Sequence, residues 1–587
     1  SVSSGTWRYV FLGVLILSFL PAAGRAESVC GDPATPISRV QGTGPTSPMA
    51  GATVTVEGIL TQDSRAKGGF GGFYLQQADH QTDGNPATSE ALFIYTDREI
   101  ADVGMRVRVT GKVKEYHGLT ELVSVRSIRA CGRGPLPAPI AITLPWTVDP
   151  EHLENMRVTF RQPLTVVDNY NLARYGELGL AASDQVQPTE YLPPGKEAHR
   201  AFTRNGANRV LLDDNRSRRD PRPVPWPPGG LSSATVRAGD QIRGLIGVLD
   251  FRFDAWRLQP SQEPAFLATN PRETAPGPRH EASVRIMALN LGNFFNGDGR
   301  GGEFPTSRGA GTPAEFRRQQ QQLVNTLLAP DPDILALTEL ENDGYGPASS
   351  IAKLAEALGG TWRFVSTPGQ DGDDEIRTGL LYRSDRISAV GPPERLTKGP
   401  FESGGRPPLA QDFGRTDGDA TVRVIVPHLK SKSCRGARGD DKDQADGQGC
   451  YASRRTNEAK TLAAWSGSDT RRHHSVGTLI IGDLNSYARE HPIAVLEQAG
   501  FTSMVHHFHP CTEKTCGHYT YRYRGQKGSL DFALASETLK PRVMGAWSWL
   551  VNADEPRVLD YRSDHPASGR GPWRSSDHNP VIVDLKL

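Results

Sequence analysis

The chain has almost no net charge, few aromatic residues and, beyond its N-terminal region, no long apolar run. Its 587 residues carry 67 Lys and Arg against 66 Asp and Glu, a net charge of +1. A global electrostatic attraction to a polyanion is therefore excluded, and any nucleic-acid contact must come from local basic patches. Aromatic residues make up 7%, whereas Gly (62) and Pro (44) are abundant, which favours β-rich, loop-rich architecture over helical bundles. The length predicts roughly three or four domains.

The N-terminal region has the pattern of a secretory signal peptide. Arg8 precedes the apolar run VFLGVLILSFL at 10–20, and small residues follow up to Ala26. This order of basic, apolar and small residues predicts a signal peptide over residues 1–26. The alternative is a transmembrane anchor, but the run is much shorter than the ~20 residues that a spanning helix needs. No later segment is long enough to span, so we expect no stable membrane span in the mature chain and a secreted protein, either extracellular or periplasmic.

Cysteine is scarce, and the six residues form no C-x-x-C pair. An even number of cysteines after a signal peptide favours disulfides over a zinc site. Proximity along the chain suggests Cys30–Cys131, Cys434–Cys450 and Cys511–Cys516, although six cysteines allow 15 pairings.

The first half of the mature chain reads as short β-strands. Five runs of alternating apolar and polar residues lie between 50 and 130, and such spacing predicts a small barrel or sandwich. The region 27–148 resembles the OB-fold domains found ahead of some secreted bacterial nucleases; it would be either a single-strand-binding module or a purely structural one. Residues 149–270 are also β-like and echo part of this pattern, so we expect a second, OB-like unit there. The prolines and glycine of 271–281 predict a linker.

From 282 to 587 strand-like runs alternate with helical stretches. The segment PAEFRRQQQQLVNTLL at 313–328 is a good helix with Thr312 as its N-cap. Residues 349–358 and 492–498 also look helical. Such interspersed elements over 300 residues predict one large α/β or α+β domain.

Polar residues of chemically useful types follow the apolar runs of this domain. Each one alone is most simply a cap or a turn former, but their order and types together are specific. They are Asn290, Glu339, His428, Asp483, Asn485, Asp531, Asp577 and His578.

These positions and their surrounding motifs resemble the endonuclease/exonuclease/phosphatase superfamily, whose members are DNase I-like, and in particular its bacterial extracellular nuclease branch. The matching stretches are RGAGTPAEFRRQ (308–319), ALTELEN (336–342), RPPLAQDF (406–413), HLKSK (428–432) and YTYRYRGQKGSLDFALAS (519–536). The resemblance implies an α+β fold, a four-layer αββα sandwich, preceded by the all-β, OB-like part.

The resemblance also implies roles for the residues that follow the strands. Phosphodiester hydrolysis needs charge neutralisation, an activated water and a stabilised leaving oxygen. Glu339 would bind the metal, with Asn290 at the metal or the phosphate and Asp577 beside the same ion. His578 would be the general base, oriented by Asp483 or by Asp577, between which the sequence does not decide. Asn485 would hold a phosphate oxygen, His428 would donate to the phosphate or leaving group, and Asp531 would orient the leaving side or the water.

A hard carboxylate site predicts Mg²⁺, with Mn²⁺ or Ca²⁺ as alternatives. The expected substrate-binding residues are Lys430, Lys432, Arg406, Arg377 and Tyr519. The function predicted is a secreted, metal-dependent nuclease that hydrolyses phosphodiester bonds of DNA, with RNA as a further substrate. The alternatives are a phosphodiesterase or phosphatase acting on lipid head groups or other phosphoesters, and a non-catalytic nucleic-acid-binding surface protein.

Overall fold

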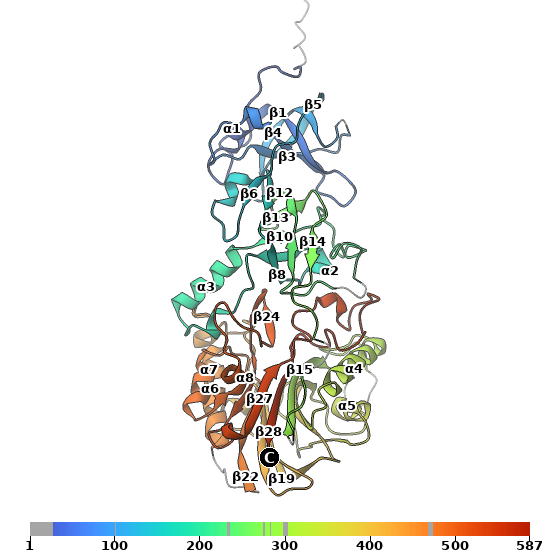
Figure 1. The fold of residues 1–587 in the computed structure, drawn as a ribbon, viewed down its shortest axis with the longest axis vertical. Helices are drawn as coiled ribbons and strands as arrows, with labels where there is room; N and C mark the ends of the chain where they lie inside the picture. The colour runs from blue at the N-terminus through green and yellow to red at the C-terminus, as the bar shows by residue number, and fades with distance from the viewer. Residues whose placement is uncertain are drawn as a thin grey trace, which may run out of the picture.

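The structure is a computed structural model that describes residues 28–99, 101–231, 235–273, 276–281, 283–297, 303–467 and 474–587. The predicted signal peptide lies outside these residues. Within them, no helix combines the length and apolar character needed to cross a bilayer. A barrel, a large mixed sheet and a two-sheet sandwich follow one another along the long axis of the molecule, from top to bottom in Figure 1.

The N-terminal unit is a closed five-stranded barrel with strand order β1-β2-β3-β5-β4. Its strands are β1 (Thr53–Ser64), β2 (Gly72–Gln76), β3 (Ala91–Tyr95), β4 (Met105–Tyr116) and β5 (Leu119–Arg133). Strand β3 pairs with β5 in parallel and the other neighbours are antiparallel. Apolar side chains such as Val56, Leu75 and Val109 fill its interior. This all-β barrel is consistent with the OB-like expectation.

Two aromatic residues and one arginine of the barrel are buried and therefore unavailable for binding a nucleic-acid strand. Phe73 and Tyr74 are fully buried, and Arg108 is buried against Glu57, with its Nη1 2.9 Å from the Glu57 carboxylate. Lys112, Lys114 and Tyr116 remain exposed on β4. Whether the barrel binds nucleic acid stays a prediction.

The middle unit is a nine-stranded sheet of order β14-β11-β8-β9-β10-β13-β12-β7-β6. The strands are β6 (Ile140–Ile142), β7 (Arg157–Phe160), β8 (Leu164–Asp168), β9 (Leu178–Ala181), β10 (Val210–Leu212), β11 (Gln241–Arg243), β12 (Leu245–Arg252), β13 (Ala255–Pro260) and β14 (Ala265–Leu267).

This sheet corrects two expectations from the sequence. A second OB-like unit was expected, but the strand order differs from that of the barrel. The run at 239–248, whose sequence pattern resembles that of β4, is broken at Gly244. The φ of Gly244 is 71° and the residue separates β11 from β12, so the two halves pair with different neighbours. The boundary at 148 is also misplaced, because β6 lies before it and pairs in parallel with β7.

The C-terminal unit contains two six-stranded sheets. The first has the order β17-β18-β16-β15-β28-β27 and the second β19-β20-β21-β22-β26-β23. The first comprises β15 (Ser283–Phe294), β16 (Ile334–Glu341), β17 (Trp362–Phe364), β18 (Ile376–Arg383), β27 (Val543–Ser548) and β28 (Val581–Lys586). The second comprises β19 (Ile387–Arg395), β20 (Arg406–Arg415), β21 (Thr421–His428), β22 (Ser475–Asp483), β23 (Thr502–Ser503) and β26 (Asp531–Ala535).

The sheets pack face to face and helices cover their outer faces. Ile286 and Ala336 of the first sheet meet Val424 and Ile481 of the second in one buried core. Helices α4 (Pro313–Leu328) and α5 (Ser350–Leu358) pack on the first sheet, and α6 (Ala452–Ser466) and α7 (His491–Gln498) pack on the second. The four-layer αββα sandwich is therefore confirmed (Figure 1).

The helix expected at 313–328 is present with its expected cap. The Thr312 hydroxyl accepts a hydrogen bond from the Glu315 N–H at 3.1 Å, which satisfies one of the free amide groups of the first turn. All three expected disulfides are formed as well.

Buried ion pairs join the middle sheet to the sandwich. Arg522 binds Asp184 of the middle unit at 2.8 Å and Asp554 of the sandwich at 2.6 Å. Arg237 of the middle unit binds Glu555 at 2.8 Å. Because the Arg522, Arg237, Asp554 and Glu555 side chains are buried, losing one partner would leave a buried charge uncompensated. The two units are therefore held in a fixed relation.

A histidine contributes a pH-dependent part of this junction. Nε2 of His506, in α8 (Met504–Phe508), lies 2.8 Å from Oε2 of Glu190 in the middle unit. Burial alone would lower the pKa of His506, but the charge of Glu190 outweighs burial and raises it. The imidazolium–carboxylate pair therefore stabilises the folded state most when His506 is protonated.

We expect His506→Gln to lower the free energy of unfolding by about 1–3 kcal/mol at acidic pH. A raised pKa in the folded state contributes stability that is complete below the unfolded value of about 6.5 and is lost as pH rises through the folded value. Urea unfolding of both proteins from pH 5.5 to 9 should show the difference shrinking with rising pH. The exposed neighbour His507→Gln is the control; a pH-independent difference for His506→Gln would contradict this account.

Candidate active site

The polar residues predicted from the strand ends converge where the two sheets meet. Strands β15 and β16 run in parallel in one sheet, and β21 and β22 run in parallel in the other. Their carboxyl ends therefore lie at the same edge of the sandwich, which faces the middle sheet. Asn290 and Glu339 come from the first pair, and His428 and Asp483 from the second.

Asn290 connects the carboxylates of the two sheets. Its Nδ2 donates to Oδ2 of Asp483 at 2.9 Å and also to Oε2 of Glu339. Its Oδ1 accepts the Gly292 N–H at 2.9 Å. With these bonds Asn290 positions the two carboxylates that flank it, and its expected place at the metal or the phosphate stays a prediction.

The orienting partner of His578 is Asp531. His578 Nδ1 lies 2.7 Å from Oδ2 of Asp531, whereas its Nε2 is 4.0 Å from Oδ1 of Asp577. The expectation of Asp483 or Asp577 in this role is thus corrected, because β26 pairs with β22 and places Asp531 directly opposite Asp483. The bond to Nδ1 fixes the ring and leaves Nε2 directed away from Asp531.

The charges around His578 determine its pKa. Burial would lower that pKa, but the negative charges of Asp531 and Asp577 outweigh burial and raise it well above the usual value. The Tyr521 ring packs against the imidazole with a centroid separation of 4.8 Å. Asp577 itself is about half exposed and lines the adjoining pocket.

His428 has the opposite environment. Burial, with the positive charges of Arg406 and His578, lowers its pKa well below the usual value. Its Nε2 lies 3.4 Å from Oδ2 of Asp483, and its Nδ1 is buried without a hydrogen-bond partner. Two imidazoles whose pKa values are shifted in opposite directions therefore both lie close to Asp483, and such a divergence of pKa values is typical of acid–base sites.

Two site residues adopt backbone conformations that L-residues rarely occupy. Glu339 has φ 58° and Asn485 has φ 44°, and such left-handed conformations persist only where the surroundings hold them. The Asn485 N–H donates to Asp483 Oδ1 at 2.9 Å, and its Nδ2 donates to the Leu429 carbonyl at 2.8 Å. The Asn485 side-chain amide, which was expected to hold a phosphate oxygen, is thus hydrogen-bonded to the turn after β21.

The carboxylates fit a divalent cation. Ligand atoms of Glu339, Asp483 and His578 all lie within 4.8 Å of one another. Burial, followed by the charge of Asp531, raises the pKa of Asp483 to about 7; burial, followed by Asp577, raises that of Glu339. A bound cation would compensate this concentration of negative charge, and carboxylate oxygens suit a hard divalent ion. Glu339 and Asp483 are the residues that would hold it.

Most of the predicted substrate-binding residues have other partners. Arg377 is buried beside Asp371 at 2.9 Å, and Lys432 is bonded to Glu490 and to the Gln448 carbonyl. The Tyr519 hydroxyl donates to Asp554. Arg406 is buried and donates to the Leu429 carbonyl at 2.6 Å. Lys430 lies 4.7 Å from the centre of the Tyr451 ring and is only partly buried.

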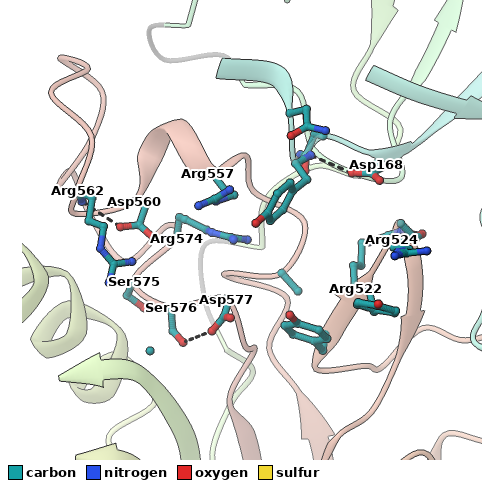
Figure 2. Close-up of a pocket in the computed structure, with 18 of the residues that line it drawn as sticks. Asp168, Arg522, Arg524, Arg557, Asp560, Arg562, Arg574, Ser575, Ser576 and Asp577 are labelled. Carbon is teal, nitrogen blue, oxygen red and sulfur yellow. Dashed lines mark hydrogen bonds between the residues drawn. The ribbon is translucent and has the colours of Figure 1, made fainter. Parts of the chain in front are cut away.

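A pocket of about 570 Å³ opens beside Glu339 and Asp577. Its walls include several residues that the sequence did not single out: Tyr170, Tyr521, Tyr523, Arg524, Arg557, Arg562 and Arg574. Figure 2 shows Arg557 and Arg574 on one side of the pocket. Arg522 and Arg524 lie opposite them, on the hairpin of β24 (Tyr521–Tyr523) and β25 (Gln526–Gly528), and Asp168 belongs to the middle sheet. Tyr521, Tyr523 and Arg524 lie in the motif at 519–536, whereas the other four residues lie in none of the family-like motifs.

The family of this domain follows from its sequence. Residues 287–578 match the model of the "Endonuclease/Exonuclease/phosphatase family", and this part of the chain belongs to that family. The enzymes of this family act on phosphoester bonds and generally use divalent metal ions. No curated protein matches the chain.

Solved structures with a similar fold include the human Nocturnin catalytic domain with bound sulfate, D. rerio TDP2 complexed with a single-strand DNA product, and a mannosyl-6-phosphatase of Bacteroides thetaiotaomicron. Their identities are 16%, 15% and 14%. Each similarity covers 52% of this chain and 95%, 100% and 100% of the respective structure, with a TM-score of 0.34.

We expect a divalent cation to raise the melting temperature of the protein, because a ligand that binds only the folded state stabilises it. In Glu339→Gln the shift produced by 10 mM MgCl₂ should fall to a small fraction of that in the parent. The control is Asp419→Asn, an exposed carboxylate in the β20–β21 turn. Equal shifts in the parent and Glu339→Gln, measured by calorimetry after chelator treatment, would exclude Glu339 as a ligand.

Proposed function

We propose that the protein is a secreted, divalent-metal-dependent nuclease that hydrolyses phosphodiester bonds of DNA, with Mg²⁺ as its ion. The observation that supports this most strongly is the Asp531–His578 pair beside the Glu339–Asn290–Asp483 cluster. It combines a base oriented by a carboxylate with a group of oxygen ligands, the two components that water attack on a phosphodiester requires.

In this proposal His578 accepts the proton of the attacking water at Nε2, while Asp531 holds Nδ1 and stabilises the imidazolium that forms. His428, whose pKa is lowered, is neutral and donates to a phosphoryl oxygen or the leaving group. When bound by Glu339 and Asp483, the cation neutralises phosphate charge and offsets the carboxylate charge that raises the pKa of His578. Asp577, at the pocket wall, borders the same group of charges.

The pocket supports a nucleic-acid substrate. Arginines are suited to phosphate because the guanidinium offers a planar set of donors, and several project into the pocket from the sandwich loops (Figure 2). Phosphate contacts of this kind position a strand without reading its sequence. The three disulfides and the signal-peptide pattern support secretion.

The direct test offers purified protein plasmid DNA, RNA and sphingomyelin, each with and without Mg²⁺. We expect cleavage of DNA that stops in excess chelator and resumes when Mg²⁺ is restored. Hydrolysis of the lipid alone would instead establish the lipid phosphodiesterase, and DNA binding without cleavage would establish the non-catalytic alternative.

We expect His578→Ala and Asp531→Asn each to lower the rate of DNA hydrolysis by about 10²–10⁴-fold. His578→Ala removes the general base. Asp531→Asn replaces the carboxylate beside His578 Nδ1 with a neutral amide. Circular dichroism and the magnesium-induced melting shift should show that both variants remain folded. His507→Ala, which alters an exposed histidine, is the control. A nearly undiminished rate for either site variant would refute its assigned role.

A further inference from the structure

One aromatic wall of the active-site pocket comes from outside the family-matching region. The end of β8 and the residues that follow it, 167–171, line the same pocket as Glu339 and Asp577. Within it, Tyr170 is 57% exposed, so this large ring is open to solvent at the pocket wall. An aromatic residue left open at such a place is a candidate contact for a flat ligand.

The position of Tyr170 is fixed from both sides of the junction. The preceding Asn169 donates through Nδ2 to the Val236 and Asp554 carbonyls, both at 2.9 Å, which ties this loop to the sandwich. The Tyr170 N–H donates to Asp168 Oδ1 at 2.9 Å. The Arg557 guanidinium lies 4.2 Å from the centre of the ring. A ring held in this way loses little conformational freedom when a ligand stacks on it.

The size of the pocket limits what can enter. About 570 Å³ is in the range of sites that enclose one small molecule, ~300–1,000 Å³. A site of this size accepts a nucleobase that has left the stack of a duplex, as in enzymes that extrude their target base. A base that enters this pocket beside Glu339 and Asp577 would therefore do so without its pairing partner.

We propose that Tyr170 stacks on an unpaired nucleobase next to the scissile phosphate, so that the enzyme acts on single-stranded or locally melted nucleic acid. Arg557 supports the ring on the pocket wall and contacts the strand's phosphate. The inference rests on the proposed nuclease function and adds its substrate form. Stacking on an aromatic ring accepts every base, so this contact would not restrict the nucleotide sequence that the enzyme cleaves.

The test compares two single-stranded oligonucleotides that differ only in a run of stable abasic sites around the cleaved bonds. The parent should cleave the base-bearing strand about 5- to 150-fold faster in kcat/KM, the factor expected from stacking one base. Tyr170→Ala should lose this preference by slowing on the base-bearing strand only, and Tyr170→Phe should keep it. The parent should also prefer the single strand to its duplex, and Tyr170→Ala should weaken that preference.

A matched control is Phe253→Ala. Phe253 is an exposed ring in the turn between β12 and β13 with Arg257 at 5.2 Å, but it does not line the pocket. Unchanged cleavage of the base-bearing strand by Tyr170→Ala would overturn the inference, as would an equal loss on both strands, which indicates a structural defect. If the parent cleaves neither oligonucleotide nor plasmid with Mg²⁺, the nuclease function itself is refuted, which is a distinct result.

Discussion

The cost of gathering carboxylates in a partly buried space is the physical constraint on which the active site depends. Asp483 and Asp531 are buried and lie opposite each other on paired strands, and Glu339 is joined to Asp483 through Asn290. Groups of like charge in such a place are unfavourable unless other charges and donors compensate them. Asn290 and His578 supply part of that compensation, and a cation would supply the rest. The same arrangement that is costly for folding is therefore what makes the site suited to metal and phosphate.

The sandwich is what keeps these groups together. Four of the site residues lie at or near the carboxyl ends of strands that run in parallel pairs. The intervening core is a tightly packed set of mostly aliphatic side chains from both sheets. Side chains on such a framework are held more precisely than side chains on loops. The positive φ angles of Glu339 and Asn485 are tolerated because the paired strands and the hydrogen bonds of the turn hold these residues.

The sandwich was predicted from the resemblance to the family, whereas the α+β character and the members of the site also leave local signals in the sequence. Apolar runs that lead to Asn290, Glu339 or Asp483 are visible in any single stretch, Asp531 opens another such run, and Thr312 marks the start of a helix. The partner of His578 was not predictable in this way, since it depends on which strand lies opposite β22. Arg377, Lys432 and Tyr519 were misjudged for a related reason: a cationic or aromatic residue in a motif has the same appearance whether its partner is a phosphate or a buried carboxylate. Tyr170 and Arg557 lie nearly 400 residues apart, and only the folded chain brings them into one pocket wall.

The middle sheet is therefore part of the active site rather than an appendage to it. Arg522 lies between Asp184 of the middle sheet and Asp554 of the sandwich, and Asp554 also accepts the hydroxyl of Tyr519. Removing the middle sheet would leave a buried guanidinium with one of its two partners and would uncover the pocket beside Glu339. Since an uncompensated buried charge is strongly destabilising, the sandwich of this chain is adapted to the presence of the middle sheet. The residues proposed to bind the ion and to act as the general base lie in the part of the chain that matches the family, whereas residues 167–171, outside that match, complete the wall of the pocket beside them.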